Sequence, residues 1–157
     1  MTKDKILIEL SSSTKTKVYK EDFASQSFPQ KVFSAIWEVE AEVNNGGFSQ
    51  YFFNNSRASA WFVALALVHV GAPKTANICE RAIAVAFPSG LPEDLYSIRS
   101  AANNFPKNIQ GKLYALDKEF YAYPHDLADL LFAYVKLNPD EFGTLLERTF
   151  PVSRLTS

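Results

Sequence analysis

Few residues of this sequence have the types and spacing that catalysis or metal binding requires. Glu38 and Glu42 are four residues apart, so on a helix their carboxylates face the same side and could share a metal ion. Helical carboxylate sites, however, pair glutamate with a Glu-x-x-His element, which this sequence does not contain. We therefore expect no metal and no cofactor, and we interpret the two glutamates as part of a solvated helix face.

The two histidines and the single cysteine are predicted to have no catalytic role. His69 falls near the end of an apolar helical segment, where a hydrogen-bonded structural imidazole is expected. His125 follows a proline and is expected to be exposed in a first helical turn. Cys79 has apolar neighbours and nothing that would lower its pKa, so an inert, mostly buried thiol is expected. Hydrolase, zinc-protease, P-loop and dinucleotide motifs are absent from the sequence, which predicts a protein without catalytic residues.

Acidic residues gather toward the C-terminal end of the chain. Residues 117–147 contain seven acids against two lysines, and the acids are Asp117, Glu119, Asp126, Asp129, Asp140, Glu141 and Glu147. Two interpretations remain open. The acids are ordinary solvated helix faces and helix starts, or they form an acidic face that a basic protein partner recognises.

A second concentration of functional side chains is the stretch from residue 44 to residue 54. Its members include Asn44, Asn45, Gly46, Gly47, Phe48, Gln50, Tyr51, Phe52 and Asn54. The Asn-Asn-Gly-Gly run predicts a sharp corner at the end of a helix, because Asn and Gly tolerate a left-handed backbone. Three rings then recur at i, i+3 and i+4, which places them on one face of a second, short helix.

Two interpretations of this corner are open. In the structural one, Asn44 or Asn45 adopts the left-handed conformation, the glycines allow close backbone approach, and Gln50 binds exposed backbone groups. In the functional one, Asn45, Gln50 and Tyr51 line a small polar pocket.

The elements that must position these residues are predicted to be helices. We expect an all-α fold, a single globular domain of seven or eight helices around a central apolar helix. Residues 58–70 contain no charged side chain and have apolar residues on every side, so we expect that segment to be the buried central helix. Pro29 and Pro73 are predicted to open helices. The best strand candidate is residues 6–10.

The domain boundaries follow from this pattern. Residues 1–28 are expected to be a tail or a loosely docked element, residues 29–150 the helical domain, and residues 151–157 a C-terminal tail. The last helix is expected to start near Asn138, with Leu145 and Leu146 on its apolar face.

Composition limits the partners. The 157 residues have a formal net charge of −1 and one cysteine, and 47% of them are hydrophobic. The absence of a basic excess argues against direct nucleic-acid binding, and the lack of a long apolar run argues against a membrane span. A single cysteine and no recognisable signal peptide predict a cytoplasmic protein.

The eleven residues from Asn44 to Asn54, with the preceding Glu40-Ala41-Glu42-Val43, resemble the hallmark motif of the DNA-mimic protein (DMP) family. Further matches follow in order, so that the resemblance covers roughly residues 30–137. They are Ala64-Leu65, Val70-Gly71-Ala72, Glu80-Arg81-Ala82, Phe87-Pro88-Ser89-Gly90, Pro92, Asp94, Leu116-Asp117, Phe120-Tyr121, Asp126-Leu127, Leu131 and Tyr134. The resemblance implies an all-α fold and, as in the family's best-known member, a dimer whose carboxylates imitate DNA phosphates and occupy a DNA-binding repressor.

Three functions are therefore open. In the first, an acidic face engages a protein partner such as a DNA-binding transcription regulator, and its candidate residues are Asp117, Glu119, Asp126, Asp129, Asp140 and Glu141. In the second, the protein forms a homodimer or binds another protein through an apolar patch. In the third, the Asn-Gly corner is a small-molecule site or an active site.

Overall fold

The structure is a computed structural model and describes residues 2–12, 18, 22–55 and 58–142. Within those residues it is all-α, with seven α-helices, three short 3-10 helices and no strand, which confirms the predicted fold class. The α-helices are α1 (Lys3–Ser12), α3 (Phe28–Asn54), α4 (Val63–His69), α5 (Pro73–Ala86), α6 (Leu95–Asn103), α7 (Lys107–Tyr121) and α8 (Leu127–Leu137). The 3-10 helices are η1 (Phe23–Ser25), η2 (Ser59–Trp61) and η3 (Pro139–Glu141).

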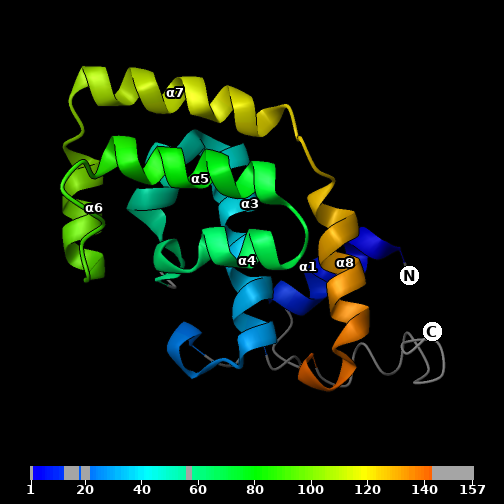
Figure 1. Ribbon diagram of the computed structural model, residues 1–157. Helices are drawn as coiled ribbons and strands as arrows, with labels where there is room; N and C mark the ends of the chain where they lie inside the picture. Colours follow the sequence, from blue (N-terminus) through cyan, green and yellow to red (C-terminus); the bar gives the residue numbers. More distant parts are fainter. Residues whose placement is uncertain (1, 13–17, 19–21, 56–57, 143–157) are drawn as a thin grey trace.

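The long helix α3 lies at the centre of the molecule (Figure 1). It begins with a capping box, in which Ser27 Oγ accepts from the Gln30 N–H and the Gln30 side chain accepts from the Ser27 N–H. Pro29 lies in its first turn, as predicted. Helices α4, α6, α7 and α8 all pack against it, so α3 is the element that positions the others.

The prediction that residues 58–70 form the buried central helix is wrong in place and in burial. That segment contains η2 and the short helix α4. Helix α4 packs against both α3 and α5, and its remaining side is exposed to solvent. Leu65 and Val68 on its outer side are 53% and 56% exposed. An uncharged sequence shows no polar face, so its pattern could not reveal which side meets water.

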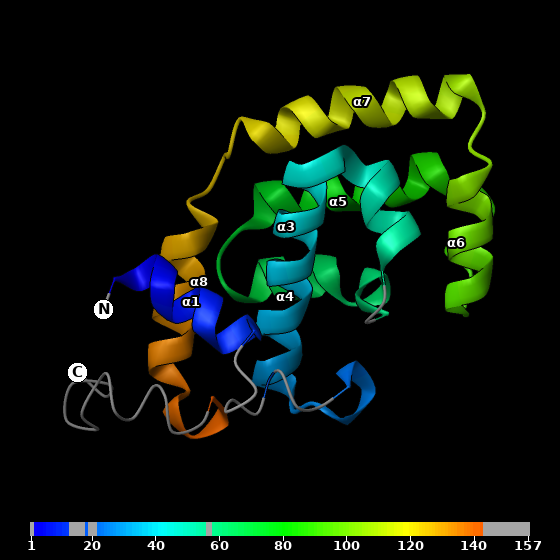
Figure 2. The ribbon, with the colours of Figure 1, turned by 180° about the vertical axis from the view of Figure 1, so that it is seen from behind.

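Helix α1 packs against α8, and the two lie side by side (Figure 2). Residues 6–10, the best strand candidate, are therefore helical. Ile6, Leu7 and Leu10 are spaced i, i+1 and i+4, which makes one helical stripe, and all three are buried.

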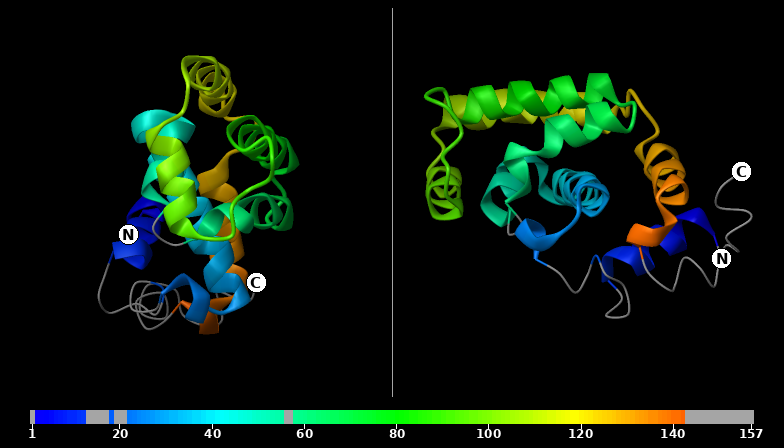
Figure 3. Two further views of the ribbon diagram at one scale, coloured as in Figure 1. Left: turned by 90° about the vertical axis from the view of Figure 1, so that its left-hand side faces the viewer. Right: turned by 60° about the horizontal axis from the view of Figure 1, so that its bottom comes forward.

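Helices α5 and α7 lie side by side and run in opposite directions (Figure 3).

Pro73 opens α5 as predicted, and Asp126 caps α8 by accepting from the Asp129 N–H. Asn138 makes no side-chain cap hydrogen bond at the start of η3, and its amide instead donates to the Tyr134 carbonyl. Residues 139–141 form a 3-10 turn. Leu145 and Leu146 lie outside the described residues.

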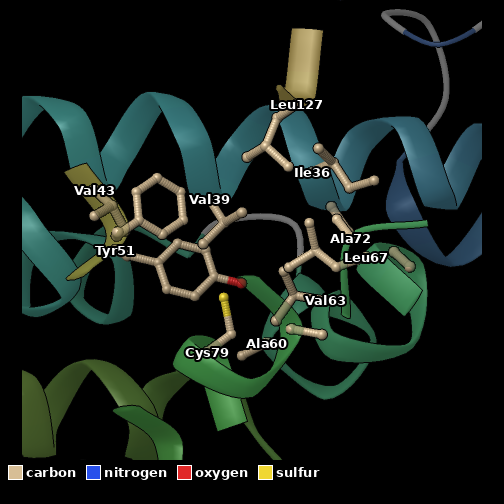
Figure 4. Close-up of a cluster of buried hydrophobic side chains, with 14 of the residues drawn as sticks. Ile36, Val39, Val43, Tyr51, Ala60, Val63, Leu67, Ala72, Cys79 and Leu127 are labelled. Atoms are coloured by element: carbon tan, nitrogen blue, oxygen red, sulfur yellow. The ribbon is translucent and has the colours of Figure 1, made fainter. Parts of the chain in front are cut away.

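Rings fill much of the core. Phe52 makes edge contacts with Phe87 and Phe105, and Phe48 packs edge-on against Phe120 of α7. Tyr51 lies in the adjoining aliphatic cluster, with its hydroxyl beside Val63 and Cys79 (Figure 4).

None of the helices in the described part of the chain combines the length and the apolar character that crossing a bilayer needs.

Candidate functional site: the helix corner and an acidic junction

The predicted corner is present as a break inside α3. The helical backbone is interrupted at Gly46 (φ −160°, ψ 16°) and Gly47 (φ 78°, ψ −177°). The left-handed position is thus Gly47, and the prediction that Asn44 or Asn45 takes it is wrong, since neither has a positive φ. A Cβ atom at Gly47 would lie 2.3 Å from Asp117 Oδ2, so the site requires glycine for its backbone angle and for the space.

Asp117 closes the corner from α7. Its Oδ1 accepts the backbone N–H of Phe48 at 2.8 Å, and the residue is only 8% exposed. Burial raises the pKa of this carboxyl group, and the Phe48 N–H partly opposes that rise. Asp117, a candidate for partner binding, therefore faces the interior. A sequence signal was available, because Asp117 lies on the same helical stripe as Leu113 and Phe120.

The two limbs of α3 are also joined by side chains. Glu42 Oε2, before the break, accepts from Gln50 Nε2 at 2.8 Å and from Asn54 Nδ2 at 3.2 Å, both after it. Gln50 thus binds a carboxylate here, and not the exposed backbone groups that the structural interpretation of the corner assigned to it. Glu38 is buried, which contradicts the predicted solvated face, and no group of three metal-ligating side chains occurs within the described residues.

The proposed polar pocket of Asn45, Gln50 and Tyr51 does not come together. Tyr51 is buried and its hydroxyl is 3.0 Å from Ser59 Oγ inside the core, whereas Asn45 is exposed. Burial raises the pKa of the Tyr51 hydroxyl well above its usual value, with the Glu38 carboxylate adding to the effect. Phe48 and Phe52 fill the space beneath the corner.

The remaining acidic candidates are spread over three places. Glu119 makes two hydrogen bonds with Arg81 of α5, at 2.8 and 2.7 Å, and this lowers the pKa of Glu119. Asp126 and Asp129 lie at the start of α8, where Asp129 pairs with Lys3 of α1. Asp140 and Glu141 lie beyond the other end of α8, on η3.

Two further acids join Asp126 and Asp129, and sequence reasoning missed them. Glu40 of α3 is half-buried, and its pKa is raised first by burial and then by the charges of Asp126 and Asp4. Lys3 donates a hydrogen bond to Asp129, and the negative charges of Asp126 and Asp4 are also close to it. These interactions raise the pKa of the Lys3 ammonium group. We call Asp4, Glu40, Asp126 and Asp129 the junction cluster. It assembles where α1, α3 and α8 meet, from segments that sequence spacing does not relate.

The histidines and the cysteine occupy three different environments. His69 is exposed, and its ring packs edge-on against Phe28 and Tyr134, in place of the predicted hydrogen-bonded interior position. His125 is partly buried, and its Nε2 accepts from the Lys74 N–H at 3.2 Å. Cys79 is buried as predicted, and burial raises the pKa of its thiol to about 12.

These features define an all-α, single-domain protein built on a kinked central helix. A family model described as DMP19-like protein matches residues 24–138, so the chain belongs to the DMP19-like protein family. This confirms the resemblance seen in the corner motif, and membership implies a DNA-mimic protein. The matched range contains α3 to α8 and leaves out α1. No curated protein and no solved structure matches the chain significantly.

Proposed function

We propose that this chain is a non-catalytic binding protein that presents the junction cluster to the basic, DNA-contacting surface of a protein partner, such as a DNA-binding transcription regulator. Membership of the DMP19-like family supports this proposal. The observation that carries it further is the convergence of acids from α1, α3 and the start of α8, where Lys3 pairs with Asp129 and the charges of Asp4 and Asp126 act on Glu40.

The junction cluster suits this role better than Asp117 and Glu119 do. Asp117 is buried, and Glu119 is already engaged by Arg81. Asp4, Asp126 and Asp129, by contrast, are exposed. Counted formally, four carboxylates and one ammonium give the cluster a charge of about −3, whereas the whole chain has a net charge of −1. Since duplex DNA presents about one charge per 1.7 Å of axis, a compact acidic area can replace only a short stretch of it.

The test is affinity capture from host-cell lysate, with elution by a short DNA duplex. The wild-type protein is compared with the Asp126→Asn/Asp129→Asn variant, in which the asparagine introduced at position 126 can still cap the helix. We expect the wild type to retain a DNA-binding protein that duplex DNA and raised salt both release, and we expect the variant to bind it at least about tenfold more weakly.

The matched control is the Glu80→Gln/Glu93→Gln variant, which removes the same charge from exposed acids away from the cluster. It should bind the partner like the wild type. Equal losses in both variants, or a bound protein that duplex DNA does not release, would contradict the proposal.

A second candidate function is self-association through the outer face of α4. Phe28, Trp61, Leu65 and Val68 are between 42% and 56% exposed, and three of them line one apolar hollow of about 530 Å³ (Phe28, Leu65 and Val68). Such a patch is typical of a protein interface, here a homodimer. Sedimentation velocity should show a dimer that persists at high salt, and Leu65→Glu/Val68→Glu should convert it to a monomer. A wild-type monomer at high concentration would dismiss this function.

A further inference from the structure

A cavity of about 330 Å³ opens between α1 and α3, and Glu40 of the junction cluster is one of its lining residues. Its lining residues are Ile8 of α1 and Trp37, Glu40, Ala41 and Asn44 of α3. This volume is at the small end of the range for ligand pockets. The cavity therefore suits a single side chain or a small organic molecule.

The walls of the cavity are apolar. Trp37 stacks on Phe33, with the ring centroids 5.9 Å apart and the planes inclined by 7°, so its indole is held in place. Ile8 faces it from α1 and is 52% exposed, an unusual position for a large aliphatic side chain on a helix whose other apolar residues are buried. Together they offer apolar contact to an alkyl stem and an aromatic ring in the wall of the cavity.

The polar end of the cavity is the carboxylate of Glu40. Tyr123 donates its hydroxyl hydrogen to Glu40 Oε1 at 3.1 Å, and the Asn44 amide donates to the same Tyr123 hydroxyl. Glu40 Oε2 accepts no hydrogen bond from the part of the chain that the structure describes. A ligand that donates a hydrogen bond can therefore use Oε2 while Tyr123 holds the other oxygen.

Tyr123 adopts a strained conformation at this point. Its φ is 48°, in the left-handed region, which costs a bulky residue about 1–3 kcal/mol. The strain persists because the surrounding contacts fix the residue: the hydroxyl binds Asn44 and Glu40, and the ring packs edge-on against Phe120. Backbone strain of this kind is concentrated at ligand clamps and active sites.

The charge around the cavity selects the sign of the ligand. Asp4 and Asp126 lie near enough to Glu40 for their charges to act on its ionisation, and the nearby Lys3 is paired with Asp129. Neighbouring negative charges, an apolar wall and an aromatic ring in that wall together match an organic cation on an alkyl stem.

We infer that the cavity lined by Ile8, Trp37, Glu40 and Asn44 binds an alkylammonium or guanidinium group, with the lysine or arginine side chain of a basic partner as its source. The inference rests on the proposed function and adds to it the position at which one partner side chain is inserted. The alternative source of the same chemistry is a free small amine.

The experiment is an NMR titration of the full-length Trp61→Phe protein, which leaves Trp37 as the single indole. The probes are N-acetyl-lysine amide, N-acetyl-arginine amide and butylammonium, with N-acetyl-norleucine amide as the uncharged control. We expect a saturable shift of the Trp37 indole N–H with the cations, and no saturation with norleucine amide. Glu40→Gln keeps the shape of the side chain and should weaken cation binding about tenfold, whereas Glu93→Gln should leave it unchanged.

The outcomes separate this inference from the proposed function. Equal binding of cations and norleucine amide, or unchanged binding in Glu40→Gln, overturns the site even if Asp126 and Asp129 still hold a DNA-releasable partner. Saturable cation binding supports the site even if no such partner is captured. Tighter binding of N-acetyl-lysine amide or N-acetyl-arginine amide than of butylammonium assigns the site to a partner side chain, and the reverse order assigns it to a free amine and overturns the partner source.

Discussion

At the scale of single residues, Asp117 meets a need that the break in α3 creates. A helix that restarts after Gly47 leaves its first amide groups without intrahelical acceptors, and Asp117 Oδ1 accepts one of them, the Phe48 N–H. Asp117→Ala should lower the free energy of unfolding by about 1–3 kcal/mol, because it leaves a buried donor unsatisfied. Asp117→Asn should cost less, since its amide oxygen can still accept. Urea unfolding measures both values, and equal losses would contradict this role.

The ionisation of Asp117 should appear in the pH dependence of stability. Burial raises the pKa of this carboxyl group in the folded state, so the folded protein binds its proton more tightly than the unfolded chain does. The resulting stabilisation is complete below the ordinary aspartate pKa of about 3.9 and is lost as the pH rises through the raised value. The stability of the wild type relative to Asp117→Asn should therefore decrease with rising pH above about 4. Unfolding curves at a series of pH values test this, and a parallel pH response of the two proteins would exclude it.

Cys79 is a second residue whose environment fixes its chemistry. Burial raises the pKa of its thiol to about 12, against about 8.5 for a free cysteine. At pH 8 the thiolate fraction is then about a thousandfold or more below that of an exposed thiol. A chromogenic disulfide reagent should label the folded protein very slowly and the urea-unfolded protein rapidly. Rapid stoichiometric labelling without denaturant would show that the thiol is accessible.

At the scale of elements, the corner of α3 depends on one backbone position. Gly47→Ala forces a side chain into the left-handed region and against Asp117, and should destabilise the fold by roughly 2–3 kcal/mol. Gly111→Ala is the matched control: this glycine lies in the middle of α7, a Cβ there meets no atom within 4 Å, and the change should stabilise by about 0.5–1 kcal/mol. Thermal unfolding of both variants gives the comparison. A Gly47→Ala protein as stable as the wild type would rule out the requirement for glycine.

Local sequence predicted where α3 and α5 begin, and it failed where contacts with a distant segment determine the structure. Pro29 and Pro73 marked true helix starts, since the ring of proline suits a first turn. The Asn-Asn-Gly-Gly run marked a true break, but its residue with a positive φ is Gly47, and the Asp117 side chain of α7 occupies the space that a Cβ there would need. The exposed side of α4 was likewise hidden, because only its neighbours α3 and α5 determine which face is covered.

At the scale of the whole molecule, α1 is held by apolar burial. A ten-residue helix is marginal by itself, so its docking on α8 must supply its stability. Ile6→Ala removes a fully buried side chain and should cost about 2–4 kcal/mol, with early loss of amide protection in α1. Lys3→Ala, which removes an exposed ion pair, should change stability little. Hydrogen exchange measures both, and a larger effect of Lys3→Ala would reverse this assignment.

The candidate site could be predicted only in part, because its acids come from helices that are far apart in the sequence. Asp126 and Asp129 are close in sequence and were predicted as part of the acidic stretch of residues 117–147, whereas Asp4 and Glu40 join them only through the packing of α1 and α3. Asp117 and Glu119 were grouped with them by sequence distance, yet one faces the core and the other faces Arg81.

Helix α1, which packs on α8, lies outside the range that the family model matches, residues 24–138. It nevertheless supplies Ile8 and Asp4 close to Glu40. Substitutions on the exposed side of α1 can thus alter which groups the cavity beside Glu40 accepts, while the kinked helix α3 and the helices packed on it stay unchanged. A short segment at one end of the chain thus sets part of the surface beside Glu40 independently of the frame that the central helix provides.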